Sequence, residues 1–208
     1  MISARKALDQ LRAGNRRFVA ERQRDGRTGA TRREEVTERQ EPFAIVLGCS
    51  DSRVPAEIVF DQGLGDLFVI RVAGNIVAPS QIGSVEFAAE QFHTRLVVVL
   101  GHTGCGAINA TIEQLKRPAE MQSRNLRAIV DRVRPSVEPL LATALRDDPQ
   151  ALVGNAVRAN VRASVSNLRH GSDILEQLIE GDGLLVVGAE YSLETGVVEF
   201  FEGLPVER

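Results

Sequence analysis

Four short apolar runs constrain the fold of this 208-residue chain more than any other feature. They occupy residues 44–47 (AIVL), 67–70 (LFVI), 96–100 (LVVVL) and 184–187 (LLVV). Each contains β-branched side chains and no polar residue, which is typical of strands whose two faces are both buried. Such strands occur in parallel sheets that helices cover on both sides.

Helical patterns lie between these runs, as parallel strands require. We predict helices over 82–92, 106–115 and about 122–168, the last one broken near Pro149. The chain is therefore expected to be α/β, with a mainly parallel β-sheet flanked by helices. The segment 191–201 predicts one more strand, at an edge of the sheet or at a subunit interface.

The first forty residues predict a helical arm and a connection, followed by an α/β core at 41–208. Gly14-Asn15 is expected to break the helical arm before Phe18, and residues 22–40 are expected to form a polar, irregular connection. No linker or repeat divides the chain, so we expect a single domain over 1–208. Three apolar residues share one face of the arm: Ala7, Leu8 and Leu11.

Composition excludes several classes of partner. Charged residues make up 25% of the chain and the formal net charge is −3, which favours neither nucleic acid nor an anionic membrane surface. No apolar run approaches the roughly 18–20 residues that span a bilayer. The N-terminus lacks an apolar targeting segment, so we expect a cytoplasmic protein. In a reducing compartment the two cysteines favour a metal-binding or reactive-thiol role over a disulfide.

Both cysteines lie just beyond predicted strands. Cys49 follows the strand at 44–47, while His102 and Cys105 follow the strand at 96–100. If these two strands are neighbours, the three side chains meet beyond the carboxyl ends of the sheet, where open α/β sheets bind ligands. The pattern predicts a metal site, and ordinary burial of two cysteines and a histidine remains the alternative.

Two thiolates and one imidazole suit Zn²⁺ and leave one tetrahedral position open, as in catalytic zinc sites. The open position favours bound water, although two thiolates neutralise the ion and weaken its acidification of that water. Asp51 can accept a hydrogen bond from the water, and Arg53 can hold Asp51 ionised. The alternatives are a surface ion pair of little energetic value and a closed state in which Asp51 is the fourth ligand.

The chain resembles the β-class carbonic anhydrases in two motifs with the same spacing, 49–55 (CSDSRVP) and 101–107 (GHTGCGA). The resemblance extends to residues 8–18, 71–75 and 187–191, and so covers nearly the whole chain. It implies that Cys49, His102 and Cys105 bind one zinc ion per chain. It also implies that Asp51 and Arg53 form a catalytic dyad.

Four further residues receive roles only from the resemblance. Gln40 matches a glutamine that hydrogen-bonds the substrate across the dimer interface, and its alternative is a solvated loop residue. Phe68 matches an apolar wall of the CO₂ pocket, and its alternative is plain strand packing. Gly106 matches a backbone donor near the metal. Ala73 matches a residue of the substrate pocket, at a position where some members have valine.

A tryptophan three residues before the first cysteine marks another subgroup, which has an inhibitory bicarbonate site. Val46 stands at that position and the chain has no tryptophan, so it resembles the subgroup with an open, water-bound zinc.

The resemblance implies reversible hydration of CO₂ to bicarbonate and a proton, by attack of zinc-bound hydroxide that the Asp51–Arg53 dyad assists. It also implies a homodimer or homotetramer. Three alternatives stay open: a hydrolase of carbonyl sulfide or carbon disulfide, a non-catalytic zinc protein, and an enzyme with Cys49 as nucleophile. His93 and His170 are candidate proton shuttles, and the alternative is that both are ordinary helix residues.

Overall fold

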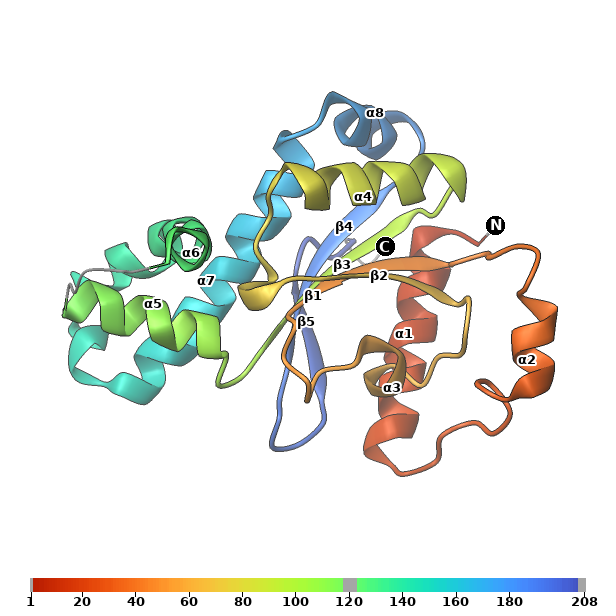
Figure 1. Cartoon of the computed structure of the whole chain (residues 1–208), viewed down its shortest axis with the longest axis horizontal. Helices are drawn as coiled ribbons and strands as arrows, with labels where there is room; N and C mark the ends of the chain where they lie inside the picture. The colour runs from red at the N-terminus through yellow and green to blue at the C-terminus, as the bar shows by residue number, and fades with distance from the viewer. Residues whose placement is uncertain (1, 118–122, 206–208) are drawn as a thin grey trace.

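A computed structural model of the chain describes residues 2–117 and 123–205. In these residues a five-stranded sheet has the strand order β2-β1-β3-β4-β5 (Figure 1). The first four strands are parallel and β5 pairs antiparallel with β4. The α/β fold with a mainly parallel sheet is therefore confirmed. The strands are β1 (Ala44–Gly48), β2 (Leu67–Arg71), β3 (Leu96–His102), β4 (Leu185–Tyr191) and β5 (Val198–Glu202).

Helices cover both faces of the sheet (Figure 1). On one face lie α1 (Ala4–Val19) and α3 (Ala56–Val59), while α2 (Ala30–Glu35) stands apart from the sheet. On the other face lie α4 (Pro79–Gln91), α7 (Pro149–His170) and α8 (Asp173–Gly181). Beyond the carboxyl ends of the strands lie α5 (Gly106–Lys116) and α6 (Arg124–Leu141), with 3₁₀ turns at η1 (Ala73–Asn75) and η2 (Ala144–Asp147).

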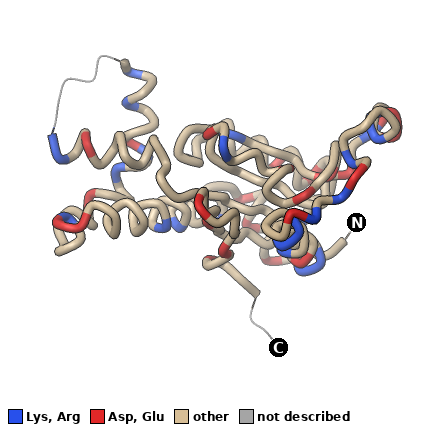
Figure 2. Tube along the Cα trace, turned by 90° about the horizontal axis from the view of Figure 1, so that it is seen from below, with Lys and Arg blue, Asp and Glu red and all other residues tan. Residues whose placement is uncertain are grey.

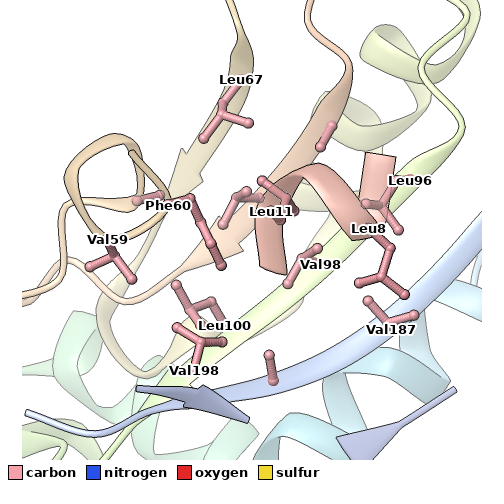
Figure 3. Packing of buried hydrophobic residues seen from close by; sticks show 14 of the residues in the cluster. Leu8, Leu11, Val59, Phe60, Leu67, Leu96, Val98, Leu100, Val187 and Val198 are labelled. Carbon is pink, nitrogen blue, oxygen red and sulfur yellow. The ribbon is translucent and has the colours of Figure 1, made fainter. Parts of the chain in front are cut away.

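The core is built from both faces of the sheet. Figure 3 shows the cluster beneath α1, where Leu8 and Leu11 pack on Val98 and its neighbours. Both leucines are almost completely buried, so replacing either with alanine is expected to cost about 2–5 kcal/mol of stability. The helical face predicted from Ala7, Leu8 and Leu11 is therefore the face that the core buries.

The predicted break at Gly14-Asn15 is wrong, because α1 continues through both residues to Val19. A Cβ atom on Gly14 would lie 1.7 Å from the carbonyl oxygen of Phe60, so only glycine allows this close approach. Asn15 donates to the carbonyls of Val59 and Gly196 and accepts from the amide of Val198. Tertiary contacts thus explain two residues that resemble helix breakers in isolation.

Other expectations need smaller corrections. The connection 22–40 contains the short helix α2, and His102 is the last residue of β3 rather than a residue beyond it. Pro149 opens α7, where its missing N–H costs nothing. Residue 122 of the predicted long helix lies outside the described residues.

Charge is mixed over the described chain. Basic and acidic segments alternate along the trace in Figure 2. No described helix is long and apolar enough to cross a membrane.

Candidate metal centre

The metal-binding candidates meet because β1 and β3 are adjacent. Gly48 on β1 is in register with Leu100 on β3, so Cys49 leaves the sheet close to where His102 ends β3. Cys105 is the N-cap residue of α5. The two sulfurs lie 4.0 Å apart, and one ligand atom from each of the three residues lies within 4.8 Å of the others. All three residues are buried, so they form a group that could hold a metal ion.

Two glycines allow this arrangement. Gly104 has φ +67°, a left-handed conformation that lets the chain turn from β3 into α5 within three residues. Gly101 faces α7, where a Cβ atom would lie 2.6 Å from the Val161 side chain. The first glycine brings Cys105 back toward His102, and the second lets α7 pack close behind the site.

The orientation of His102 leaves one nitrogen for a metal. Its Nδ1 atom lies 3.0 Å from the Thr103 carbonyl, which can only accept, so Nδ1 carries the hydrogen. Nε2 then presents a lone pair. That atom is buried and has no hydrogen-bond partner in the part of the chain that the structure describes. A buried, unpartnered acceptor is costly unless something binds it, and a metal ion satisfies it.

The pKa values of the two thiols also favour binding of a cation. The hydrogen bond from Cys105 holds the pKa of Cys49 well below its usual range, and the same contact, together with burial, raises the pKa of Cys105. One sulfur is thus a buried thiolate beside a second sulfur. A donor set of two sulfurs and one imidazole nitrogen fits zinc.

The pair of Asp51 and Arg53 lies beside this cluster. Asp51 accepts three hydrogen bonds from Arg53, one from its backbone amide and two from its guanidinium at 2.9 and 2.7 Å. These bonds hold the pKa of Asp51 well below its usual range. Asp51 Oδ2 lies 3.9 Å from His102 Nε2, so an ionised carboxylate stands next to the nitrogen that could bind a metal. The Arg53 side chain is 59% exposed in a single chain.

Arg71 is a site residue to which the sequence analysis gave no role. It ends β2, in register with Gly48, and its guanidinium donates to the carbonyls of Cys49 and Asp51 at 3.1 and 2.6 Å. The loop that carries Cys49 and Asp51 is thus held by an arginine of the neighbouring strand. The available signal was an arginine at the end of a buried apolar run.

The substrate-pocket candidates divide into two groups. Ala73 precedes Gly74, whose amide donates to the Cys49 sulfur, and Gly106 follows Cys105, so both adjoin the metal-binding cluster. Gln40 is exposed and lies before β1, at the opposite end of the sheet from Cys49. Phe68 is half-buried and packs against the rings of Phe87 and Phe92. A single chain does not bring Gln40 or Phe68 to the cluster.

The candidate shuttles also lie away from the cluster. His93 follows α4 and borders the same surface hollow as Gln40, a hollow of about 540 Å³. His170 ends α7, where Nδ1 lies 3.6 Å from a Glu176 oxygen.

Comparison with known proteins places this chain in one family. Residues 44–198 match the family model for carbonic anhydrase. A carbonic anhydrase of Mycolicibacterium smegmatis is 40% identical over 193 residues, covering 93% of this chain and 91% of the relative. The chain belongs to the carbonic anhydrase family.

Two solved structures identify the fold as that of the β class. The β-carbonic anhydrase CafA of Aspergillus fumigatus matches with a TM-score of 0.73 and 24% identity, over 83% of this chain and 81% of that one. A structure from a study of two tetrameric β-carbonic anhydrases of Sordaria macrospora matches with a TM-score of 0.70 and 23% identity, over 81% and 84%. The resemblance in the sequence is thereby confirmed.

Proposed function

We propose that this protein catalyses the reversible hydration of CO₂ to bicarbonate and a proton at a zinc ion. The observation that carries the proposal is the buried Cys49, His102 and Cys105 cluster, whose unpartnered Nε2 atom lies 3.9 Å from the Asp51 carboxylate. Those three residues would hold one zinc ion per chain. When bound, zinc supplies the acidification of water that makes a nucleophile available near neutral pH.

Asp51 and Arg53 would orient that nucleophile. An ionised Asp51 accepts a hydrogen bond from the attacking oxygen and so directs an oxygen lone pair toward the CO₂ carbon. Arg53 keeps Asp51 ionised and fixed in direction through three hydrogen bonds. This pairing supports the open arrangement, with Asp51 free of the metal, and the closed state becomes a rearrangement that must first break these bonds. The released proton passes to buffer in this proposal.

The protein would act as a homodimer or homotetramer. Ala73 and Gly106 adjoin the cluster in one chain, whereas Gln40 and Phe68 reach a cluster only if a second chain presents them. The exposure of Arg53 and the tetrameric relatives from Sordaria macrospora support the same assembly. Two free thiols as ligands suit a reducing compartment such as the cytoplasm.

Metal analysis and stopped-flow CO₂ hydration on one sample test the proposal. We expect one zinc per chain, unreactive thiols and rapid hydration, with carbonyl sulfide assayed in parallel as the alternative substrate. A protein that holds stoichiometric zinc but does not accelerate CO₂ hydration would falsify the proposed activity. Reactive Cys49 without zinc would instead favour a cysteine nucleophile.

A further inference from the structure

The turn between β2 and α4 has an unusual backbone next to the metal-binding cluster. Gly74 and Asn75 have φ values of +71° and +43°, so two consecutive residues are left-handed. A Cβ atom on Gly74 would lie 3.1 Å from the Ala107 side chain, so the turn is also closely packed. Asparagine adopts the left-handed conformation more readily than other non-glycine residues, but at a cost that contacts with the surroundings offset.

This conformation points the Gly74 amide at the metal-binding cluster. The Gly74 N–H donates to the Cys49 sulfur at a distance of 3.4 Å. The Cys105 thiol lies 4.0 Å from the same sulfur. The amide is therefore a neutral donor to a sulfur that would carry negative charge as a metal ligand.

Two buried side chains of α7 hold the turn from behind. Asn160 Nδ2 donates to the Gly74 carbonyl at 2.8 Å, and Ser164 Oγ donates to the Asn75 carbonyl at 3.0 Å. The two residues are 2% and 3% exposed, and a spacing of four places them on one face of the helix. These bonds connect α7 to the turn beside Cys49, although Asn160 follows Cys49 by more than 100 residues in the chain.

The two bonds hold the peptide planes 74–75 and 75–76 through their carbonyls. The Gly74 N–H belongs to the preceding plane, 73–74, which joins the first held plane at the Gly74 Cα atom. The two bonds therefore hold the turn in which this N–H donates to the Cys49 sulfur. We infer that Asn160 and Ser164 are positioning residues for the Cys49 thiolate. They act through the Gly74 amide. The inference rests on the proposed role of Cys49 as a metal ligand.

The consequence is chemical as well as structural. Two thiolates donate so much charge that they weaken the acidification of water by the metal. An N–H···S hydrogen bond withdraws part of that charge from the sulfur, and such outer contacts tune metal sites. Asn160 and Ser164 would thus keep the Cys49 sulfur a weaker donor with a fixed direction.

Two variants and two matched controls test the inference. Asn160→Leu and Ser164→Ala each remove one bond to the turn. Asn15→Leu removes a buried asparagine that bonds three backbone groups of other segments, and Ser136→Ala removes a buried hydroxyl with no partner among the described residues. The readouts are zinc affinity by chelator competition and the sulfur-to-metal charge-transfer band of the Co²⁺-substituted protein.

We expect Asn160→Leu to lower zinc affinity by about tenfold, at the low end for outer contacts of a metal site. Its charge-transfer band should move to lower energy, because a sulfur without its hydrogen bond is a stronger donor. Ser164→Ala should change both quantities in the same direction by less. Asn15→Leu should lower the melting temperature and leave the charge-transfer band unchanged. Ser136→Ala should leave the melting temperature and the band unchanged.

A purely structural role for Asn160 and Ser164 predicts lower stability with the wild-type band and zinc affinity, and that result overturns the inference. If Asn160→Leu does not fold, Ser164→Ala decides alone. A wild-type protein that binds zinc without hydrating CO₂ defeats the proposed function, whereas a band shift in the variants would still support the positioning role. A wild-type protein that binds no metal overturns both.

Discussion

The two ends of the sheet differ in how much of the proposed chemistry they hold. At the carboxyl end, one chain brings together the three ligand candidates, the carboxylate beside them and the arginines that hold their loop. At the amino end lie Gln40 and His93, around an open hollow of about 540 Å³. The five residues of β1, about 16 Å of extended chain, separate the two ends.

This difference teaches that parallel strands bring the candidate ligands together within one chain, along with Ala73 and Gly106, but do not bring Gln40 or Phe68 to them. Strand ends converge within one chain, so ligands on two loops meet as soon as β1 and β3 pair. Residues that precede the strands cannot reach that point in the same chain. If Gln40 acts on the substrate, it acts in the site of a second chain.

The largest expected effect comes from the proposed zinc ligands at the carboxyl end of the sheet. Cys49→Ser or His102→Ala should remove zinc and abolish CO₂ hydration, because each leaves only two protein ligands. Zinc content and stopped-flow rates measure this directly. His93→Ala is the matched control, since it removes a histidine from the amino end and should keep both zinc and activity. Full activity in a metal-free Cys49→Ser protein would show that the activity does not depend on a metal at the carboxyl end of the sheet.

The next effect separates orientation from metal binding. Asp51→Ala should keep the zinc and lose about 10²–10⁴-fold in turnover, the range typical of a positioned acid–base group. Asp51→Asn keeps the size of the side chain and should lose activity too, because an uncharged amide no longer pairs with Arg53. Loss of zinc in Asp51→Ala would show instead that Asp51 belongs to the ligand set.

The cluster at the carboxyl end of the sheet could be predicted from the sequence for a physical reason. Uninterrupted apolar runs indicate buried parallel strands, and the positions of Cys49 and His102 after such runs predict their meeting. The adjacency of β1 and β3 was an assumption that only the topology could confirm.

Contacts between residues far apart in the chain could not be predicted from the sequence. The continuation of α1 through Gly14 depends on the Phe60 carbonyl, and the hold of Asn160 on Gly74 joins residues 86 positions apart. Neither leaves a periodic or local signal in the sequence. The same holds for Arg71, whose bonds to the Cys49 and Asp51 carbonyls follow from strand register.

A substitution of Gln40 tests whether the amino end of the sheet contributes to activity. Gln40→Ala is expected to lower activity by less than Asp51→Ala, since one hydrogen bond to the substrate is lost while the nucleophile remains. The zinc content should be unchanged. A Gln40→Ala protein with wild-type rates would assign Gln40 to the solvated loop.

Mixing the two defective chains then asks which chain supplies Gln40. In a mixed dimer of Gln40→Ala and Asp51→Ala chains, one site would combine an intact Asp51 with the intact Gln40 of the other subunit. At a 1:1 ratio, random association makes half of the dimers mixed, so about a quarter of all sites become intact. The activity of the refolded mixture should therefore exceed the mean of the two separate variants, by up to about a quarter of the wild-type activity. No restoration would place Gln40 and Asp51 in the site of the same chain.

The smallest expected effect concerns the two candidate shuttles. His93 lies at the amino end, and His170 ends α7 ten residues beyond Asn160, about 15 Å along the helix. Neither can exchange a proton directly with the cluster of its own chain.

His93→Ala and His170→Ala should therefore leave turnover within about twofold of wild type in concentrated buffer, where proton transfer is not limiting. The informative condition is dilute buffer. If either histidine is a shuttle, its alanine variant should turn over more slowly there, and added imidazole should restore the rate. Such rescue for His93→Ala would indicate that the amino end of a second chain lies near the cluster, which the Gln40 experiment also tests.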